Sequence, residues 1–387
     1  MRILLKNLKV VTPFRIAEAE DILIEGRKIK ELRRDINEKE ADIIFDLSGK
    51  IATPGFVDLH VHGAMNHDFT EATEESIQEI VKHFLRHGTT GLLATLYTKP
   101  KEMLIQDIRN IVRYMEWGEA DRTVMGIHIE GPFINPEMHG AMRKDYVWRP
   151  SLEDWYLLRD AGRNYIKLMT IAPEVEGSME IIRDASLHGI VPSLGHSKAP
   201  FDLIEEAIDN GMAHVTHIFN AMEPLHHRKP GVLTAALLRD ELKVQLIGDG
   251  FHIHPAIIKL LYKLKGHTGI ILITDAIRVA GMPDGEYTFS GQRVFIKEGK
   301  VVLEDGTLAG SSLTLDRAVK NMVRLCDIPL THAVRMASLN PIRVLGKEHR
   351  KGILAVGKDA DIVIMDEDFN VLMTIQEGNV RFNALEG

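Results

Sequence analysis

Ligand-type side chains recur where apolar, β-branched runs of this sequence end. The first such run carries His60 and His62, and because strand side chains alternate, both point to one side and can reach one ion. Four later runs end in Glu130, His196, His217 and Asp275. A single histidine in such a run is more often a hydrogen-bonded core residue, as we expect for His128 and His214. Six ligand-type residues at equivalent positions would be buried without partners if they only packed, so the set indicates a metal site.

The donor types limit which ion is bound, and how many. Nitrogen and carboxylate ligands without thiolate suit zinc, iron, cobalt, manganese or nickel. Glu130, His196 and His217 make an open hydrolytic site that leaves room for water. Adding His60, His62 and Asp275 makes room for a second ion. We therefore expect two ions with Glu130 between them.

Eight apolar runs that alternate with amphipathic stretches would position these residues. The runs are 55–62, 89–97, 123–130, 166–172, 190–196, 214–220, 243–248 and 269–275. Glycines should close five of the intervening helices in a left-handed conformation, namely Gly88, Gly118, Gly162, Gly189 and Gly211. Eight β/α units in series predict a closed parallel (β/α)8 barrel of the TIM type, with its site at the C-terminal ends of the strands. A doubly wound sheet would need a Gly-rich phosphate-binding first turn, which is absent.

Shorter strands are expected outside the barrel. At the chain ends they are predicted at 3–11, 21–24, 28–32, 43–46, 361–365, 371–375 and 380–382. Residues 1–52 and 351–387 are thus expected to form a small β domain, and residues 53–350 the barrel. A β insert at 287–303 contains the hairpin signal Glu298-Gly299, and helices are expected at 313–326 and 330–338.

Composition restricts the class of partner and the compartment. A formal net charge of -8 over 387 residues disfavours binding of nucleic acid or anionic membranes, but leaves an anionic small substrate possible. Cys326 is the only cysteine, so no internal disulfide can form. The apolar N-terminal run is broken by Lys6 and Lys9, and no run reaches membrane-spanning length. We expect a cytoplasmic protein.

Nine blocks in a single register resemble the amidohydrolase superfamily. They are PGFVDLHVHG (54–63), HIEGPFINP (128–136), APE (172–174), SLGHSKA (193–199), THIFNAMEPLHHRKPG (216–231), IGDGFHIHP (247–255), TDA (274–276), AGSSLTLDRAV (309–319) and GKDADIV (357–363). FNAM followed by HHRKPG is not a general superfamily feature. It resembles the branch that hydrolyses N-acetylglucosamine 6-phosphate to glucosamine 6-phosphate and acetate. The resemblance also implies that the terminal strands form a β-sandwich.

The resemblance implies roles for the polar residues. Glu130, His196 and His217 would hold the principal metal, whose bound water is acidified enough to supply hydroxide near neutral pH. Asp275 would take the proton of that water and later give it to the leaving amine. His252 would polarise the acetamide carbonyl.

The resemblance also implies how the substrate is held. Asn220 and Ala221 would line the sugar pocket, and His227 and Arg228 would bind the phosphate. Arg228 would reach the site of the neighbouring subunit, so a homodimer is expected. Without the resemblance, the basic run around Arg228 would be read as a solvated loop.

One position departs from the pattern of the family. Where the family usually has a polar residue, often histidine, that contacts a sugar hydroxyl, this sequence has Met142. A thioether is a poor hydrogen-bond partner for a hydroxyl, so His139 or Arg143 would have to substitute. The choice between the gluco and galacto sugars stays open.

Two other functions remain as alternatives. Cyclic-amide hydrolases of the superfamily typically bridge their metals with a carboxylated lysine on strand four, whereas strand four here runs into Thr170 to Glu174 without a lysine. A non-catalytic scaffold would generally have lost metal ligands, and this sequence keeps a full set.

Overall fold

The computed structural model describes residues 1–117, 122–289 and 291–385, which divide into two compact units. One unit consists of Met1–Asp58, Lys82–Gly91 and Thr314–Gly387, and the other of Leu59–Val81 and Leu92–Leu313. The domain limits expected after residues 52 and 350 stay a prediction.

Strands from both ends of the chain form one eight-stranded sheet. Its order is β21-β20-β19-β5-β1-β2-β3, with β4 pairing with β1. The strands are β1 (Arg2–Val11), β2 (Ile16–Glu25), β3 (Lys28–Arg33), β4 (Ile43–Asp46), β5 (Ile51–Pro54), β19 (Ile362–Met365), β20 (Val371–Gln376) and β21 (Asn379–Asn383). Antiparallel pairing of β19 with β5 joins the two ends, and Ile3, Ile22 and Ile362 belong to one buried core. The predicted β domain from both termini is confirmed.

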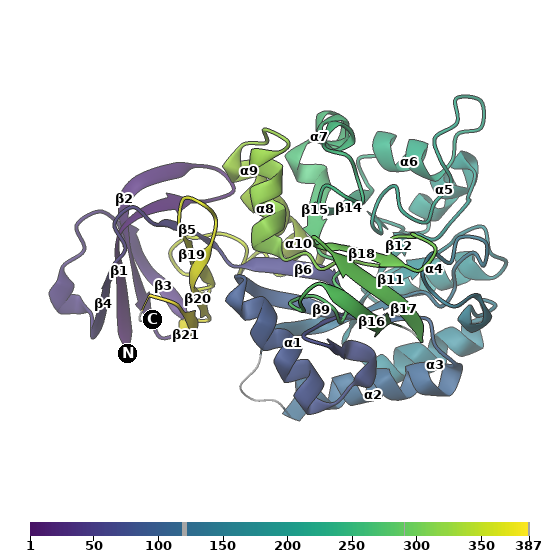
Figure 1. Cartoon of the computed structure of the whole chain (residues 1–387), viewed down its shortest axis with the longest axis horizontal. Helices are drawn as coiled ribbons and strands as arrows, with labels where there is room; N and C mark the ends of the chain where they lie inside the picture. Colours follow the sequence, from purple (N-terminus) through teal and green to yellow (C-terminus); the bar gives the residue numbers. More distant parts are fainter. Residues whose placement is uncertain (118–121, 290, 386–387) are drawn as a thin grey trace. The chain divides into compact units, whose positions relative to one another are not determined.

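The predicted barrel is confirmed as well. Its eight strands follow one another in chain order: β6 (Phe56–Val61), β9 (Thr89–Tyr97), β10 (Val124–Glu130), β11 (Ile166–Ile171), β12 (Val191–Leu194), β13 (His214–Val215), β14 (Lys243–Ile247) and β15 (Ile270–Ile273). The ends of the first and last strands come together, because the Asp275 backbone N–H donates to the His60 carbonyl at 2.9 Å and Val61 forms a parallel bridge with Ala276. Figure 1 shows several of these strands with helices α2 to α7 along their unit.

Apart from α10 (Leu339–Val344), which was not predicted, the helices occupy the predicted stretches. They are α1 (Glu74–Arg86), α2 (Lys101–Trp117), α3 (Leu152–Gly162), α4 (Ser178–Leu187), α5 (Phe201–Asp209), α6 (Val232–Leu238), α7 (Pro255–Gly269), α8 (Leu315–Arg324), α9 (Leu330–Ala337) and α10 (Leu339–Val344), with 3-10 turns η1 (Glu38–Glu40), η2 (Phe69–Glu71) and η3 (Lys144–Tyr146). Within the described ranges, we find no helix that combines the length and apolar character needed to cross a bilayer.

Three of the predicted helix-closing glycines have the expected geometry, and one does not. Gly88, Gly189 and Gly211 follow their helices with φ of 79°, 71° and 104°. Gly162 is instead the last residue of α3, and Arg163, which follows it, has a positive φ of 49° with ψ of -123°. A Cβ at Gly162 would lie 2.2 Å from the Ile166 side chain, so close packing explains this glycine. Gly118 lies outside the described residues.

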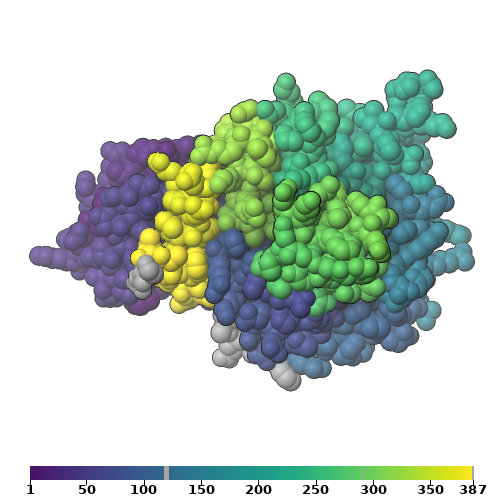
Figure 2. Space-filling model, in the orientation of Figure 1, coloured from purple at the N-terminus to yellow at the C-terminus, as the bar shows by residue number. Residues whose placement is uncertain are grey.

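A three-stranded antiparallel sheet interrupts the chain after the barrel. It consists of β16 (Gly285–Phe289), β17 (Gln292–Lys297) and β18 (Lys300–Leu303). Glu298 and Gly299 link β17 to β18 with φ of 53° and 79°, which confirms the predicted two-residue turn. Phe289 packs in one buried cluster with Met142 and Ile277. Figure 2 shows the insert, in green, on the surface of the barrel unit.

Candidate metal centre

The six predicted ligands lie together at the C-terminal ends of the barrel strands. His60 is in β6, His62 directly follows it, and Glu130 ends β10. The other three lie two residues beyond the ends of β12, β13 and β15, and are His196, His217 and Asp275. The donor atoms form two groups, each within 4.8 Å: Glu130, His196, His217, and His60, His62, Asp275. Five of the six are buried, and the Asp275 side chain keeps 13% exposure.

Three of the ligands sit where the backbone is strained. His196, His217 and Asp275 have φ of 50°, 24° and 50°. Residues other than glycine rarely adopt this region, and such conformations concentrate at functional sites. The strain marks the points at which the chain leaves a strand, and nothing in the local sequence pattern signals it.

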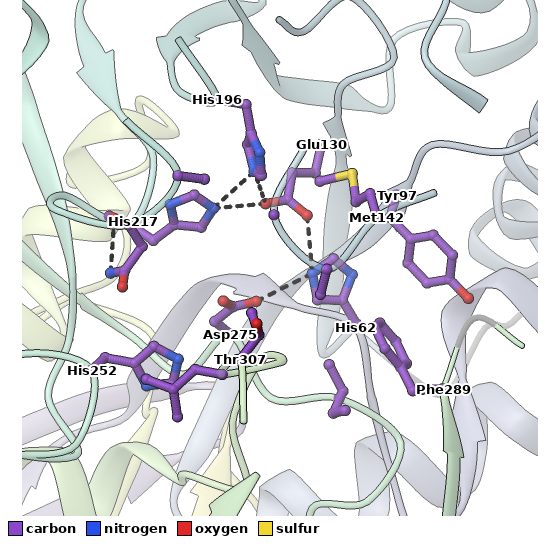
Figure 3. A pocket seen from close by; sticks show the side chains of 17 residues that line it. His62, Tyr97, Glu130, Met142, His196, His217, His252, Asp275, Phe289 and Thr307 are labelled. Carbon is purple, nitrogen blue, oxygen red and sulfur yellow. Dashed lines mark hydrogen bonds and ion pairs between the residues drawn. The ribbon is translucent and has the colours of Figure 1, made fainter. Parts of the chain in front are cut away.

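Glu130 lies between the two groups (Figure 3). Its Oε1 is 2.9 Å from Nε2 of His217 and 3.1 Å from Nε2 of His196, while its Oε2 is 3.3 Å from Nε2 of His62. Burial alone would raise the pKa of Glu130, but the charge of His60 and hydrogen bonds from the other histidines lower this pKa well below its usual value. Glu130 is therefore a carboxylate, as a metal ligand must be.

The chemistry of the donors fits a divalent transition metal. The Nε2 atoms of His196 and His217 are 3.1 Å apart, and those of His60 and His62 are also 3.1 Å apart. Asp275 Oδ1 lies 3.3 Å from both members of the second pair. Imidazole lone pairs that converge in this way repel one another unless a proton or a cation lies between them. Four imidazoles and two carboxylates thus provide two adjacent sites for nitrogen- and oxygen-binding ions.

The hydrogen-bond acceptors that orient two of the candidate ligands were not predicted from the sequence. Oε1 of Gln245, in β14, is 3.0 Å from Nδ1 of His60, and the carbonyl of Met138 is 2.7 Å from Nδ1 of His196. Such contacts fix the tautomer of a ligating histidine. The available signal was a polar glutamine inside the apolar run 243–248. The Met138 carbonyl had no signal, since any residue supplies one.

His128 and His214 occupy the core, as expected. Nε2 of His128 is 2.9 Å from the Thr170 hydroxyl, and Nδ1 of His214 is 3.1 Å from the Ser193 hydroxyl. Burial lowers the pKa of His128 well below its usual value and that of His214 to about 3. Both rings are neutral at physiological pH.

A cavity of about 240 Å³ opens onto the metal ligands. The predicted substrate residues Asn220, Ala221 and His252 line it, and so do Tyr97 and Phe289. Nδ1 of His252 is 2.6 Å from the Asp249 carboxylate, which leaves Nε2 for other contacts. Burial lowers the pKa of His252, but the hydrogen bond and charge of Asp249 outweigh it, so the net shift is upward.

His227 and Arg228 are not brought to this cavity. They lie on an exposed loop, with Nη1 of Arg228 2.8 Å from Nε2 of His227. Among the residues that line the cavity in the described ranges, none is lysine or arginine. The described lining of the cavity in one chain therefore offers no permanent cation for a phosphate.

Met142 does line the cavity, and the two residues expected to replace it do not. The Thr98 hydroxyl donates to the Met142 sulfur at 3.4 Å. Nδ1 of His139 is 2.6 Å from the Met142 carbonyl, and Arg143 pairs with Asp145 at 2.7 Å. Their side chains are directed to these contacts, so neither supplies a sugar-hydroxyl partner in this conformation.

Comparisons with known proteins agree over nearly the whole chain. Residues 51–381 match the model of the amidohydrolase family. The N-acetylglucosamine-6-phosphate deacetylase of Lysinibacillus sphaericus is 37% identical over 381 residues, or 98% of each chain, and the N-acetylgalactosamine-6-phosphate deacetylase of Escherichia coli O157:H7 is 33% identical over 85% of this chain and 87% of its own. An aspartate-to-alanine mutant of N-acetyl-D-glucosamine-6-phosphate deacetylase from Mycobacterium smegmatis, solved in complex with N-acetyl-D-glucosamine-6-phosphate, superimposes with a TM-score of 0.92 at 30% identity, covering 99% of this chain and 100% of that one.

Proposed function

The chain belongs to the amidohydrolase family, and from that premise we propose that it removes the acetyl group from N-acetylglucosamine 6-phosphate. The products are acetate and glucosamine 6-phosphate. The observation that carries the proposal is the pair of facing ligand groups at the mouth of the barrel. The proposal is supported by two relatives with this activity in their names, which match 98% and 99% of the chain.

The enzyme uses a divalent metal, and its ligands follow from the two groups. We propose Glu130, His196 and His217 for the principal ion, and His60, His62 and Asp275 for a second. The donors favour zinc or iron, while cobalt, manganese and nickel are compatible. When bound, the metal would act as a Lewis acid and would lower the pKa of water enough to supply hydroxide near neutral pH.

The side chains of the chain itself perform the remaining steps. Asp275 borders the cavity and is the general base that takes the proton of the attacking water, and then the acid that delivers it to the leaving nitrogen. His252 donates from Nε2 to the acetamide oxygen as negative charge develops there. Asp249 holds the opposite ring nitrogen at 2.6 Å, which fixes the ring and favours its protonated form.

The phosphate is bound across a homodimer in this proposal. Arg228 and His227 are exposed and basic, while one chain alone offers its cavity no lysine or arginine from the described ranges. A surface for a second copy is available on α7, where Ile257, Leu260 and Leu264 recur at helical spacing and are 39%, 48% and 49% exposed. Arg228 would thus serve the site of the neighbouring subunit.

N-acetylgalactosamine 6-phosphate is the second candidate substrate, because Met142 offers no hydrogen bond to distinguish the epimers. An acetate-release assay with both 6-phosphates and the unphosphorylated glucose derivative tests the proposal. We expect the highest kcat/KM for the gluco 6-phosphate. A galacto preference would reassign the substrate, and no acetate from any of the three sugars would refute the function.

Metal analysis tests the alternative of a non-catalytic scaffold. A purified chain that holds no stoichiometric transition metal, even after zinc or iron is added, would favour the scaffold. We also propose a cytoplasmic location, supported by the single, buried Cys326.

A further inference from the structure

Every histidine in the proposed centre directs Nε2 toward the other ligands, so each Nδ1–H must find an acceptor elsewhere. His60 and His196 have one, in Gln245 and in the Met138 carbonyl. Nδ1 of His217, in the first group, and Nδ1 of His62, in the second, are buried and have no hydrogen-bond partner in the described part of the chain. In the second group, His62 is therefore the histidine for which no acceptor that would fix the tautomer has been identified.

An unsatisfied acceptor lies in the hairpin that follows His62. Strand β7 (Gly63–Ala64) pairs antiparallel with β8 (His67–Asp68), which places Asp68 opposite Gly63. The Phe69 N–H also donates to the His62 carbonyl at 2.8 Å. Asp68 is only 2% exposed, and its Oδ2 is buried without a hydrogen-bond partner among the described residues.

The other oxygen of Asp68 has a purely structural task. Oδ1 accepts from the Thr70 backbone N–H at 2.8 Å and from its hydroxyl at 2.6 Å, which caps η2. Tyr97 lies near both side chains: its hydroxyl is 3.2 Å from the Thr70 hydroxyl that donates to Asp68, and its ring centroid is 5.7 Å from that of His62. The cap accounts for Oδ1 and leaves Oδ2 unexplained.

We propose that Asp68 is a positioning residue, and that its Oδ2 receives the Nδ1–H of His62 through one buried water. A single water accepts from the imidazole and donates to the carboxylate, so both buried groups are satisfied at once. The contact fixes the tautomer in which Nε2 of His62 is the ligand, and it makes that nitrogen more basic. The inference rests on the two-ion site of the proposed function, and it concerns the second ion only.

Graded removal of metal tests the proposal. Zinc-loaded wild-type protein and variants are dialysed against increasing chelator, and the zinc left on each chain is counted. Asp68→Asn keeps an oxygen for the cap but removes the carboxylate, and we expect it to weaken the second ion about 10- to 100-fold while the first ion is retained as in the wild type. Thr70→Val is the matched control, since it weakens the cap and leaves Oδ2 in place. It should lower the thermal unfolding midpoint and spare the second ion.

Three results would overturn the proposal. Asp68→Asn could retain both ions as the wild type does, or Thr70→Val could lose the second ion as readily as Asp68→Asn. The third such result is a wild-type protein that binds only one ion. If Asp68→Asn does not fold, imidazole NMR of the zinc-loaded wild type tests whether the Nδ1–H of His62 is held in a hydrogen bond. A solvent-protected Nδ1–H signal that disappears in His62→Asn is expected, and its absence counts against the proposal. Acetate release is measured on the same samples. Failure of the proposed function would thus appear as missing activity, with the difference in zinc retention intact.

Discussion

Oε2 of Glu130 lies 3.3 Å from Nε2 of His62, while Oε1 of the same carboxylate lies 2.9 Å from Nε2 of His217. One buried side chain thus contacts both ligand groups, with a different oxygen for each. A carboxylate in this position can bridge two ions, because each oxygen is a separate donor.

The proposed two-ion arrangement predicts different results for the two groups. His62→Ala should reduce the metal content from two ions to one and leave part of the activity, because the principal group stays complete. His217→Ala should lose the principal ion, and with it almost all turnover. Elemental analysis of dialysed protein, paired with acetate release, checks both. Identical metal content in the two variants would contradict the assignment.

Asp275→Asn should separate binding from chemistry. The principal ligands remain, so the first ion and the KM should change little, while the loss of proton transfer lowers kcat by roughly a thousandfold or more. Asp209→Asn, on the exposed end of α5, is the control and should behave as wild type. Near-normal turnover by Asp275→Asn would remove it from the mechanism.

Arg228→Ala should raise the KM for the sugar phosphate about 10- to 100-fold, since a charge-assisted hydrogen bond contributes roughly 1.5–3 kcal/mol. The KM for the unphosphorylated sugar should be unaffected. Lys229→Ala is the neighbouring control, with a smaller effect expected because a lysine lacks the planar fork of arginine. Equal effects of Arg228→Ala on both sugars would argue against a phosphate contact.

Mixed dimers test whether Arg228 acts across subunits. In a dimer of Arg228→Ala with Asp275→Asn, the site that keeps Asp275 receives its arginine from the partner. Random exchange at equal amounts makes half of the dimers mixed, so about a quarter of the wild-type activity should return at low substrate. No recovery after proven subunit exchange would place the action of Arg228 within its own chain.

The lowered pKa of the buried His83 predicts that the folded protein loses stability in acid. Burial, followed by the charge of His87, lowers the pKa of His83 from 6.5 to about 4. Between pH 6.5 and about 4, His83 is therefore protonated in the unfolded chain but neutral in the folded chain. The free energy of unfolding consequently falls as the pH drops through this range. His83→Gln should abolish roughly 3 kcal/mol of this dependence. Urea unfolding at pH 7 and 4.5 measures it, with the exposed His349→Gln as control; equal pH dependence in His83→Gln and wild type would contradict it.

Much of the fold was predictable because its signals are local. Period-two and helical patterns located all eight barrel strands, and the Glu298-Gly299 turn follows from the conformations that these two residues tolerate. The prediction that Gly162 closes α3 in a left-handed conformation was wrong because it also relied on a local signal. A glycine at a helix end looks alike in sequence whether it closes the helix or makes room for Ile166, and only packing distinguishes the two.

The six candidate ligands were chosen from residue type and position alone, since catalytic side chains of a barrel lie where its strands end, and the structure brings their donor atoms together. The position of Glu130 between two pairs of histidines agrees with the arrangement expected from sequence. Only the tertiary structure set Gln245 behind His60, and left Nδ1 of His62 and Oδ2 of Asp68 buried without hydrogen-bond partners among the described residues. It also showed that Arg228 does not line the cavity of its own chain. Residue type determines which atoms can bind a metal or donate a proton. Their partners depend on contacts between segments far apart in the chain, which exist only after folding has brought those segments together.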